Sequence, residues 1–336
     1  MKVVSILGER QAGIVDVPDP SPKEDWALVK VHVAPMCTEY KGFIQGHRGD
    51  CLGHEAVGEV VEVAQPCRVK PGERVVVQPQ YPCGKCHLCL CGEYVHCQDN
   101  ADVEAFLGSR VGTAAMAQYV VKPSWLLTPI PDDMTYERAG LALCALGPTF
   151  NSCQLTRVTA ADTVLITGLG PVGLGGVVNA LFRGARVIGV DGIEWRRRRA
   201  LEMGAHAAFD PAEPELPERL RSMTSRNGAD VAIDTSGATE AHDLCLKALR
   251  RKGRFSLVQG FGASPVGLGH FVWSGHSLFG AWHYNLGDYP QIMEVIRRSP
   301  LLDLLHSHTF AMSDVQKAFE LQATGQCAKV MLRPWE

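Results

Sequence analysis

The amino-acid sequence predicts an α/β fold in which a small, barrel-like β domain is joined to a doubly wound parallel sheet. Residues 1–150 read mostly as short strands separated by turns, whereas strands alternate with helices from about residue 160 onward. The chain has 336 residues, which is more than one hydrophobic core usually supports. We therefore expect a β domain over residues 1–150, a parallel-sheet domain over 151–285, and a return to the first domain over 286–336.

Alternation of apolar and polar residues marks the strands of the β domain. The opening segment MKVVSILGER reads as a strand and not as a secretion signal, because it has no apolar segment followed by a cleavage site. Turns such as Lys70-Pro71-Gly72-Glu73 separate the strands that follow. The clearest of these strands are residues 27–33, 56–63 and 74–77.

Continuous apolar strands with helices between them mark the second half of the chain. Residues 163–167 (TVLIT) form such a strand, and a glycine-rich turn and a helix follow it. Buried strands that alternate with helices are typical of a parallel sheet covered on both faces. The further expected strands are residues 186–190, 231–233, 254–259 and 329–332, and the further expected helices are 194–203, 239–249, 289–298 and 313–324.

The composition excludes several classes of partner. A net charge of −3 gives no reason to expect nucleic acid or an anionic membrane surface as a partner. No apolar run approaches the roughly 20 residues that a membrane-spanning helix needs. We expect a cytoplasmic protein. Its 12 cysteines are many for a reducing compartment, where disulfides are disfavoured, so metal binding is the better explanation for them.

Four closely spaced cysteines give the strongest local signal. Their two-residue gaps place sulfur atoms around one ion and favour a closed, structural zinc site within a lobe at about residues 80–100. An iron–sulfur cluster also uses four cysteines, but the spacing matches neither common ferredoxin pattern. Cys91 and His87 lie within the lobe and are interpreted as bystanders. The four expected ligands are Cys83, Cys86, Cys89 and Cys97.

A glycine-rich turn after the first parallel strand predicts a dinucleotide site. Glycines at this place allow a tight turn and the close approach of a pyrophosphate to a helix N-terminus. Asp191 ends the next strand, 18 residues after the last glycine of the motif, and can accept hydrogen bonds from ribose hydroxyls. NAD is therefore favoured over NADP, although the run that begins at Arg196 offers a possible partner for a 2′-phosphate. The expected cofactor contacts are Gly168, Gly170, Pro171, Val172, Gly173, Asp191, Arg196 and Gly260.

Three separate residues are candidates for a second metal site. Cys37 and His54 fall in the β domain, and Cys144 falls near its junction with the parallel sheet. A buried cysteine is usually a small hydrophobic residue, and a lone histidine is usually a hydrogen-bonded core residue. The residues themselves therefore leave open whether these three form a metal site.

The order of these motifs resembles the zinc-containing medium-chain dehydrogenase/reductase family, whose members are alcohol dehydrogenase-like. Cys37, Gly53-His54-Glu55, the four-cysteine lobe and the GLGPVG turn carry the resemblance, which covers essentially the whole chain. Asp234-Thr235-Ser236-Gly237 and Lys329-Val330 look like later landmarks of the family. The resemblance implies a GroES-like catalytic domain, a Rossmann domain, two zinc ions per chain and a homo-oligomer, with dimer and tetramer both open.

The resemblance also implies roles for individual residues. Cys37, His54 and Cys144 would bind a catalytic zinc, and Glu55 would be a neighbouring carboxylate able to exchange with water at the metal. Three protein ligands leave a fourth position open, as a catalytic zinc requires. The implied activity is hydride transfer between an alcohol (a secondary alcohol, polyol or sugar) and a nicotinamide cofactor.

One departure from the family pattern concerns the proton relay. Cys37 is followed by Thr38-Glu39-Tyr40, so the hydroxyl comes one position early and a glutamate stands where the hydroxyl is expected. The relay could use Thr38, Glu39 or His47. An altered relay would also fit a redox-neutral enzyme that uses zinc and NAD, such as an epimerase, a lyase or a cyclase.

Overall fold

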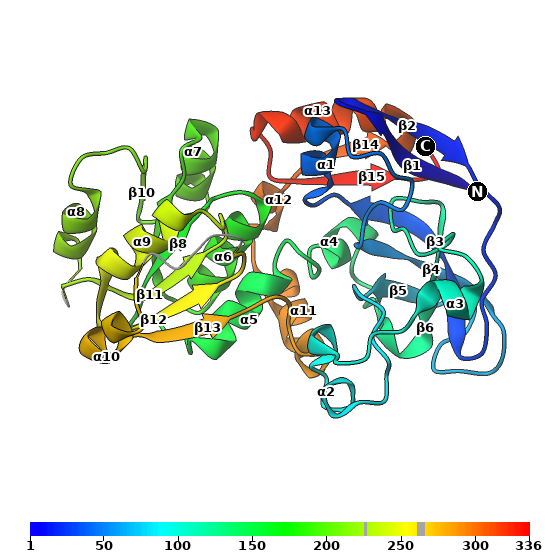
Figure 1. Ribbon diagram of the computed structural model, residues 1–336, viewed down its shortest axis with the longest axis horizontal. Helices are drawn as coiled ribbons and strands as arrows, with labels where there is room; N and C mark the ends of the chain where they lie inside the picture. The colour runs from blue at the N-terminus through cyan, green and yellow to red at the C-terminus, as the bar shows by residue number, and fades with distance from the viewer. Residues whose placement is uncertain (225–226, 261–265) are drawn as a thin grey trace.

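Two sheets organise the chain, one in each half of the molecule (Figure 1). The computed structural model describes residues 1–224, 227–260 and 266–336. Both chain ends lie on the side of the molecule that carries the β domain (Figure 1). Among the helices of the described residues, none combines the length and the apolar character needed to cross a membrane.

The parallel sheet has the strand order β10-β9-β8-β11-β12-β13, and every neighbouring pair runs parallel. The order reverses between β8 and β11, and such switch points are where doubly wound sheets bind ligands. This confirms the predicted fold class. The strands are β8 (Thr163–Thr167), β9 (Arg186–Val190), β10 (Ala207–Phe209), β11 (Ala229–Asp234), β12 (Leu249–Leu257) and β13 (Ser277–Gly280). The helices of this half are α5 (Gly147–Leu155), α6 (Pro171–Phe182), α7 (Glu194–Glu202), α8 (Leu216–Ser222), α9 (Thr239–Ala248) and α10 (Gly269–Ser274).

The β domain contains a seven-stranded sheet and a separate hairpin of β1 and β2. The last strand, β15, pairs antiparallel with β3, so the end of the chain returns to this sheet (Figure 1). The strands are β1 (Lys2–Gly8), β2 (Gln11–Asp16), β3 (Trp26–Pro35), β4 (Ala56–Val63), β5 (Arg74–Val77), β6 (Tyr119–Pro123), β7 (Leu127–Pro129), β14 (His306–Ala311) and β15 (Lys329–Arg333). The remaining helices are α1 (Glu39–Gln45), α2 (His87–Leu90), α3 (Val103–Leu107), α4 (Tyr136–Gly140), α11 (Tyr289–Arg298), α12 (Leu302–Leu305) and α13 (Val315–Thr324).

One hydrophobic cluster connects the two sheets. It contains Val57 of β4, Leu143 and Ala145 from the connecting segment, and Val164 of β8, all fully buried. Because Leu143 and Ala145 flank Cys144, their burial fixes the backbone that carries this cysteine between the two halves.

The structure differs from the sequence expectations mainly in short or late elements. Helix α1 occupies a segment for which the sequence predicts neither a helix nor a strand, and its buried Phe43 stacks on Phe319 of α13 at 5.2 Å between ring centroids. A seven-residue helix with one buried side chain leaves little periodicity to detect. Strand β12 begins and ends earlier than the expected residues 254–259, because Leu249 and Phe255, not the following turn, are buried in the sheet.

Candidate active site and metal centres

The four cysteines of the lobe converge as a tetrahedral site requires. Their sulfur atoms all lie within 4.8 Å of one another. Three of the sulfur–sulfur distances are 3.5 Å (Cys86–Cys89) and 3.9 Å (Cys83–Cys89 and Cys86–Cys97). A tetrahedron with metal–sulfur bonds of about 2.3 Å has edges of about 3.8 Å, so the donor set fits one zinc ion.

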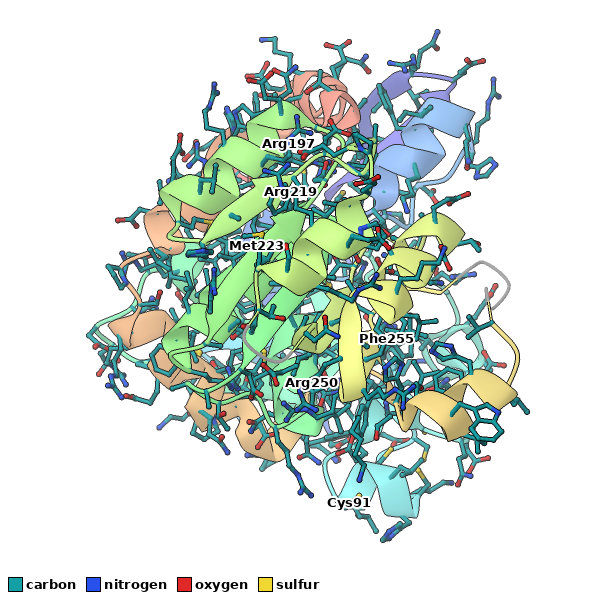
Figure 2. All side chains as sticks on the ribbon, turned by 90° about the vertical axis from the view of Figure 1, so that its left-hand side faces the viewer. Cys91, Arg197, Arg219, Met223, Arg250 and Phe255 are labelled. Carbon is teal, nitrogen blue, oxygen red and sulfur yellow. The ribbon has the colours of Figure 1, made fainter. Side chains whose placement is uncertain are left out.

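The other two candidate ligands in the lobe stand apart from this cluster. His87 and Cys91 are exposed and contribute no atom to it. Cys91 lies on the lobe at the lower edge of the view in Figure 2, and its thiol donates to the carbonyl of Leu88. The lobe has a hydrophobic cluster of only four buried residues, so metal coordination would supply much of its stability.

A second cluster forms where the two halves of the molecule meet. One donor atom each of Cys37, His54, Glu55 and Cys144 lies within 4.8 Å of the others. His54 Nε2 is 3.1 Å from Cys144 Sγ and 3.9 Å from Glu55 Oε1. The fold thus brings together Cys37, His54 and Cys144, and Glu55 adds a carboxylate oxygen to the same cluster.

Each ligand candidate is positioned by its local structure. Cys37 follows the end of β3 directly. His54 follows Gly53, whose φ of +83° and whose contact with Met116 exclude a side chain: a Cβ there would lie 2.7 Å from Met116 Cγ. Cys144 lies between the buried residues Leu143 and Ala145 of the segment that connects the two sheets. Its backbone N–H donates to Glu55 Oε2 at 3.0 Å.

Glu39 orients the histidine of this cluster. Its Oε1 lies 3.0 Å from His54 Nδ1, and its Oε2 accepts the backbone N–H of Cys37 at 2.8 Å. With Nδ1 bound to a carboxylate, Nε2 is left to face the two thiols. A carboxylate that accepts the other ring N–H orients metal-binding histidines in this way. Glu39 therefore has both oxygens occupied and holds the site together, a role that the sequence did not predict.

The charges of the cluster favour a cation at its centre. A hydrogen bond from Cys144 lowers the pKa of the Cys37 thiol well below its usual range. Burial alone would lower the pKa of His54, but hydrogen bonds with Cys37 and Glu39 raise it to about 11. The surrounding thiolate and carboxylates thus hold a proton on the imidazole. A divalent zinc ion bound by Cys37, His54 and Cys144 would supply this positive charge instead, so the residues present fit the metal.

A buried ion pair connects the cluster to Lys329. Lys329 Nζ lies 2.5 Å from Glu55 Oε1, and both side chains are almost completely buried. Burial raises the pKa of Glu55 to about 7, although the charge of Lys329 opposes this rise. Lys329 comes from β15, so the returning end of the chain contributes to the site. The sequence feature that could have indicated this role is a single lysine at the start of a mostly apolar strand.

The three relay candidates differ in their positions. Thr38 is half-buried and lines the cavity of about 390 Å³ at the metal cluster, together with His54, Gln259 and His283. Glu39 is engaged with His54 and Cys37, as described above. His47 is exposed and lines neither cavity at the cluster; it follows Gly46, the residue in left-handed conformation that ends α1.

The expected dinucleotide residues surround neighbouring cavities at the switch point of the parallel sheet. One cavity is lined by Gly168, Gly170, Pro171, Val172, Asp191 and Arg196. Val172 lines the cavity at the metal cluster as well, and Gly260 lines only that second cavity. Gly173 lies beneath them: a Cβ there would be 1.8 Å from the Gly168 carbonyl oxygen, so only glycine lets α6 approach β8 this closely. Asp191 accepts the N–H groups of Leu169 and Ile193 at 2.7 and 2.8 Å, which fixes the turn.

The arginine run lies on α7, and most of it is engaged by the protein. Arg197, labelled in Figure 2, donates to the Asp191 carbonyl and to Asp210 at 2.7 and 2.8 Å. Arg198 faces Glu202 at the surface. Arg196 alone of the run lines the cavity of the glycine-rich turn, where its guanidinium donates to the carbonyl of Gly325.

Comparisons with known proteins agree with this architecture. Residues 23–132 match the model of the alcohol dehydrogenase GroES-like domain, and residues 171–298 match that of the zinc-binding dehydrogenase domain. The sequence is similar to sorbitol dehydrogenase of Bacillus subtilis (29% identity over 99% of this chain and 97% of the relative). It is also similar to erythritol/L-threitol dehydrogenase of Mycolicibacterium smegmatis (30% identity over 99% and 98%). An Escherichia coli alcohol dehydrogenase solved with NADH has a similar structure (TM-score 0.85, 25% identity, 99% of both chains).

Proposed function

The chain belongs to the zinc-containing medium-chain alcohol dehydrogenase family, and from this premise we propose that it transfers a hydride between a secondary alcohol of a polyol or sugar-type substrate and NAD, at a zinc ion bound by Cys37, His54 and Cys144. A second, structural zinc would occupy the four-cysteine lobe. The relatives described as sorbitol and erythritol/L-threitol dehydrogenases support a polyol as the substrate.

The observation that carries the proposal is the shared wall of two cavities. Cys37, Thr38 and Val172 line both the cavity at the metal cluster and the cavity of the glycine-rich turn. A dinucleotide on the turn would therefore end beside the cluster, so that an alcohol there could lie next to the nicotinamide ring. Hydride transfer needs this proximity of the reacting groups.

The side chains of the cluster have separate roles in this reaction. When bound, zinc would supply Lewis acidity that lowers the pKa of the substrate hydroxyl, so that the hydride can leave for NAD. In our proposal Thr38 Oγ1 accepts a hydrogen bond from the substrate hydroxyl and relays its proton, releasing the proton of its own hydroxyl to solvent water, because Thr38 lines both cavities. Glu39 keeps His54 Nε2 directed at the metal position. With a hydroxyl available at Thr38, no feature of the described site favours the redox-neutral alternative.

A direct test is oxidation of polyols and simple secondary alcohols by the zinc-loaded protein with NAD, followed by the absorbance of NADH. We expect turnover that a chelator abolishes and that added zinc restores. Turnover that withstands removal of both zinc ions would contradict the proposed role of the metal. Binding of NAD without oxidation of any alcohol would contradict the proposed reaction.

Electrostatics supports NAD in preference to NADP. The cavity on the other side of Asp191 is lined by four further carboxylates and, within the described chain, by no lysine or arginine; these carboxylates are Glu213, Glu215, Glu240 and Asp243. A 2′-phosphate placed there would meet like charges. We assign Arg196 to the pyrophosphate, because its guanidinium faces Gly170 at the turn, 3.8 Å from the position of a Cβ.

Replacing Asp191 by asparagine is expected to weaken the preference for NAD. The variant keeps an acceptor oxygen for one of the two N–H groups of the turn. It loses the negative charge that repels a 2′-phosphate and that pairs with Arg196, and it loses an oxygen that can accept the ribose hydroxyls. We expect the ratio of kcat/KM for NAD to that for NADP to fall by a factor of about 10 to 100. Asp210→Asn is the matched control, because Asp210 pairs with Arg197 and lines none of the three cavities. An unchanged ratio in Asp191→Asn would contradict the assignment.

A further inference from the structure

A fourth cavity, of about 410 Å³, lies beside the proposed active site. His54 and Gln80 line both this distal cavity and the cavity at the metal cluster, so the two meet at these residues. A substrate whose hydroxyl group reaches the cluster therefore lies next to the distal cavity. Cys51, Thr113 and Lys122 form parts of its wall.

Lys122 is a buried lysine in this wall. It lies on β6 with 3% of its surface exposed, donates from Nζ to the Gln80 carbonyl at 2.5 Å, and sits 3.9 Å from the ring centroid of Tyr81. Gln80 has a φ of +68°, a left-handed conformation that is unusual for glutamine, at the point where its carbonyl meets this ammonium. An ammonium has three N–H donors, so these two contacts leave one donor for a ligand.

No carboxylate compensates this charge. Within residues 1–224, 227–260 and 266–336, the contacts of Lys122 Nζ are the Gln80 carbonyl and the Tyr81 ring and include no carboxylate, and burial is the single cause that lowers its pKa, to about 7. Burying an unpaired charge is costly, and an apolar side chain of the same length would fill this position without that cost. A bound anion would complete the site and offset the cost.

The other charged groups of the distal cavity are exposed. Arg110 lies at the rim and forms no ion pair with any described residue. Asp102 and Glu104 are the acidic groups of the lining, and Asp102 is engaged as the N-cap of α3, where it accepts the N–H of Ala105. Water screens these exposed charges much more than it screens Lys122. Among Lys122, Arg110, Asp102 and Glu104, the charge of the buried lysine is therefore the least screened by water.

We propose that the distal cavity binds an anionic group, a carboxylate or a phosphate, at the far end of the alcohol substrate, with Lys122 as its buried partner and Arg110 at its rim. The proposal rests on the proposed function for the reacting end of the substrate. It narrows the substrate class to polyols or hydroxy compounds that carry one such group.

The test compares three matched compounds: sorbitol, sorbitol 6-phosphate and gluconate. We expect the zinc-loaded enzyme with NAD to have a higher kcat/KM for one of the two anions than for sorbitol. In Lys122→Met this preference should fall by a factor of about 10 to 100, mainly through KM, whereas Arg110→Gln should lower it about threefold. Lys70→Met, at an exposed turn, is the control and should leave the preference unchanged. Which anion is preferred distinguishes a phosphate from a carboxylate.

A binding measurement separates this proposal from the proposed function. Calorimetric titration of the NADH-loaded enzyme with the same compounds needs no turnover, so it reports on the distal cavity even if no alcohol is oxidised. Equal affinity for sorbitol and both anions, or a preference that survives in Lys122→Met, would overturn the proposal. If Lys122 has only a structural role, the Met variant should lose thermal stability without a change in preference. If that variant does not fold, the exposed Arg110→Gln decides: an unchanged preference overturns the proposal.

Discussion

Replacing Cys37 by alanine is expected to reduce NAD-linked alcohol oxidation by about 10³- to 10⁵-fold, because a lost ligand removes the metal that lowers the pKa of the substrate hydroxyl. Cys37 is one of only three thiol or imidazole donors in the cluster, and the others, His54 and Cys144, come from separate segments. Two protein ligands would hold zinc too weakly to keep it through purification. The bound zinc, measured by elemental analysis, should fall from about two ions per chain to about one.

Two other cysteine variants make this result specific to the cluster. Cys89→Ser should also lose one zinc ion, but it should lower the thermal midpoint while the remaining folded enzyme keeps its turnover, because the lobe site is closed. Cys91→Ser should change neither quantity, since Cys91 is exposed and outside both clusters. If Cys37→Ala kept two zinc ions or full turnover, Cys37 would not be a ligand of the catalytic metal.

The sequence predicted those parts of the fold that depend on local patterns of apolar and turn residues. Strands β4, β5, β8 and β9 have the bounds that were expected, because each is a short apolar or alternating run between turn residues. Asp191 directly follows the last of them, so the dinucleotide site followed from the same pattern. Helix α1 was missed, since its stability depends on packing against α13, which lies more than 270 residues later in the chain.

The candidate site was predictable only in part, for a similar reason. The lobe cysteines lie within 15 residues of sequence, so their spacing alone indicated one site. Cys37, His54 and Cys144 are far apart, and the resemblance to a family was needed to connect them. The partner of His54 was not predictable: Glu39 was considered for the relay, but no local pattern shows that positions 39 and 54 meet. His47 was a candidate for the proton relay because an imidazole can transfer protons, and the structure places it at the surface.

The pair of Lys329 and Glu55 gives the largest expected effect on stability. Lys329→Met should lower the free energy of unfolding by about 3–5 kcal/mol, because it leaves a fully buried carboxylate without its cation. Glu55 also accepts the backbone N–H of Cys144, so its loss of support should loosen the metal cluster as well. Urea unfolding of the two proteins under the same zinc and NAD concentrations measures the difference.

A double-mutant cycle shows whether this loss comes from the unpaired carboxylate. Burial already raises the pKa of Glu55 to about 7 against the opposing charge of Lys329, so without the lysine the buried carboxylate is strongly disfavoured. Glu55→Gln removes that charge, and in the Lys329→Met background it should therefore restore more than about 1 kcal/mol of the loss. Lys317→Met, at an exposed pair with Asp314 on the surface of α13, should cost less than about 0.5 kcal/mol. Additive losses for Glu55→Gln and Lys329→Met would mean that the two side chains stabilise the protein independently, and that the returning strand β15 supports the site by packing alone.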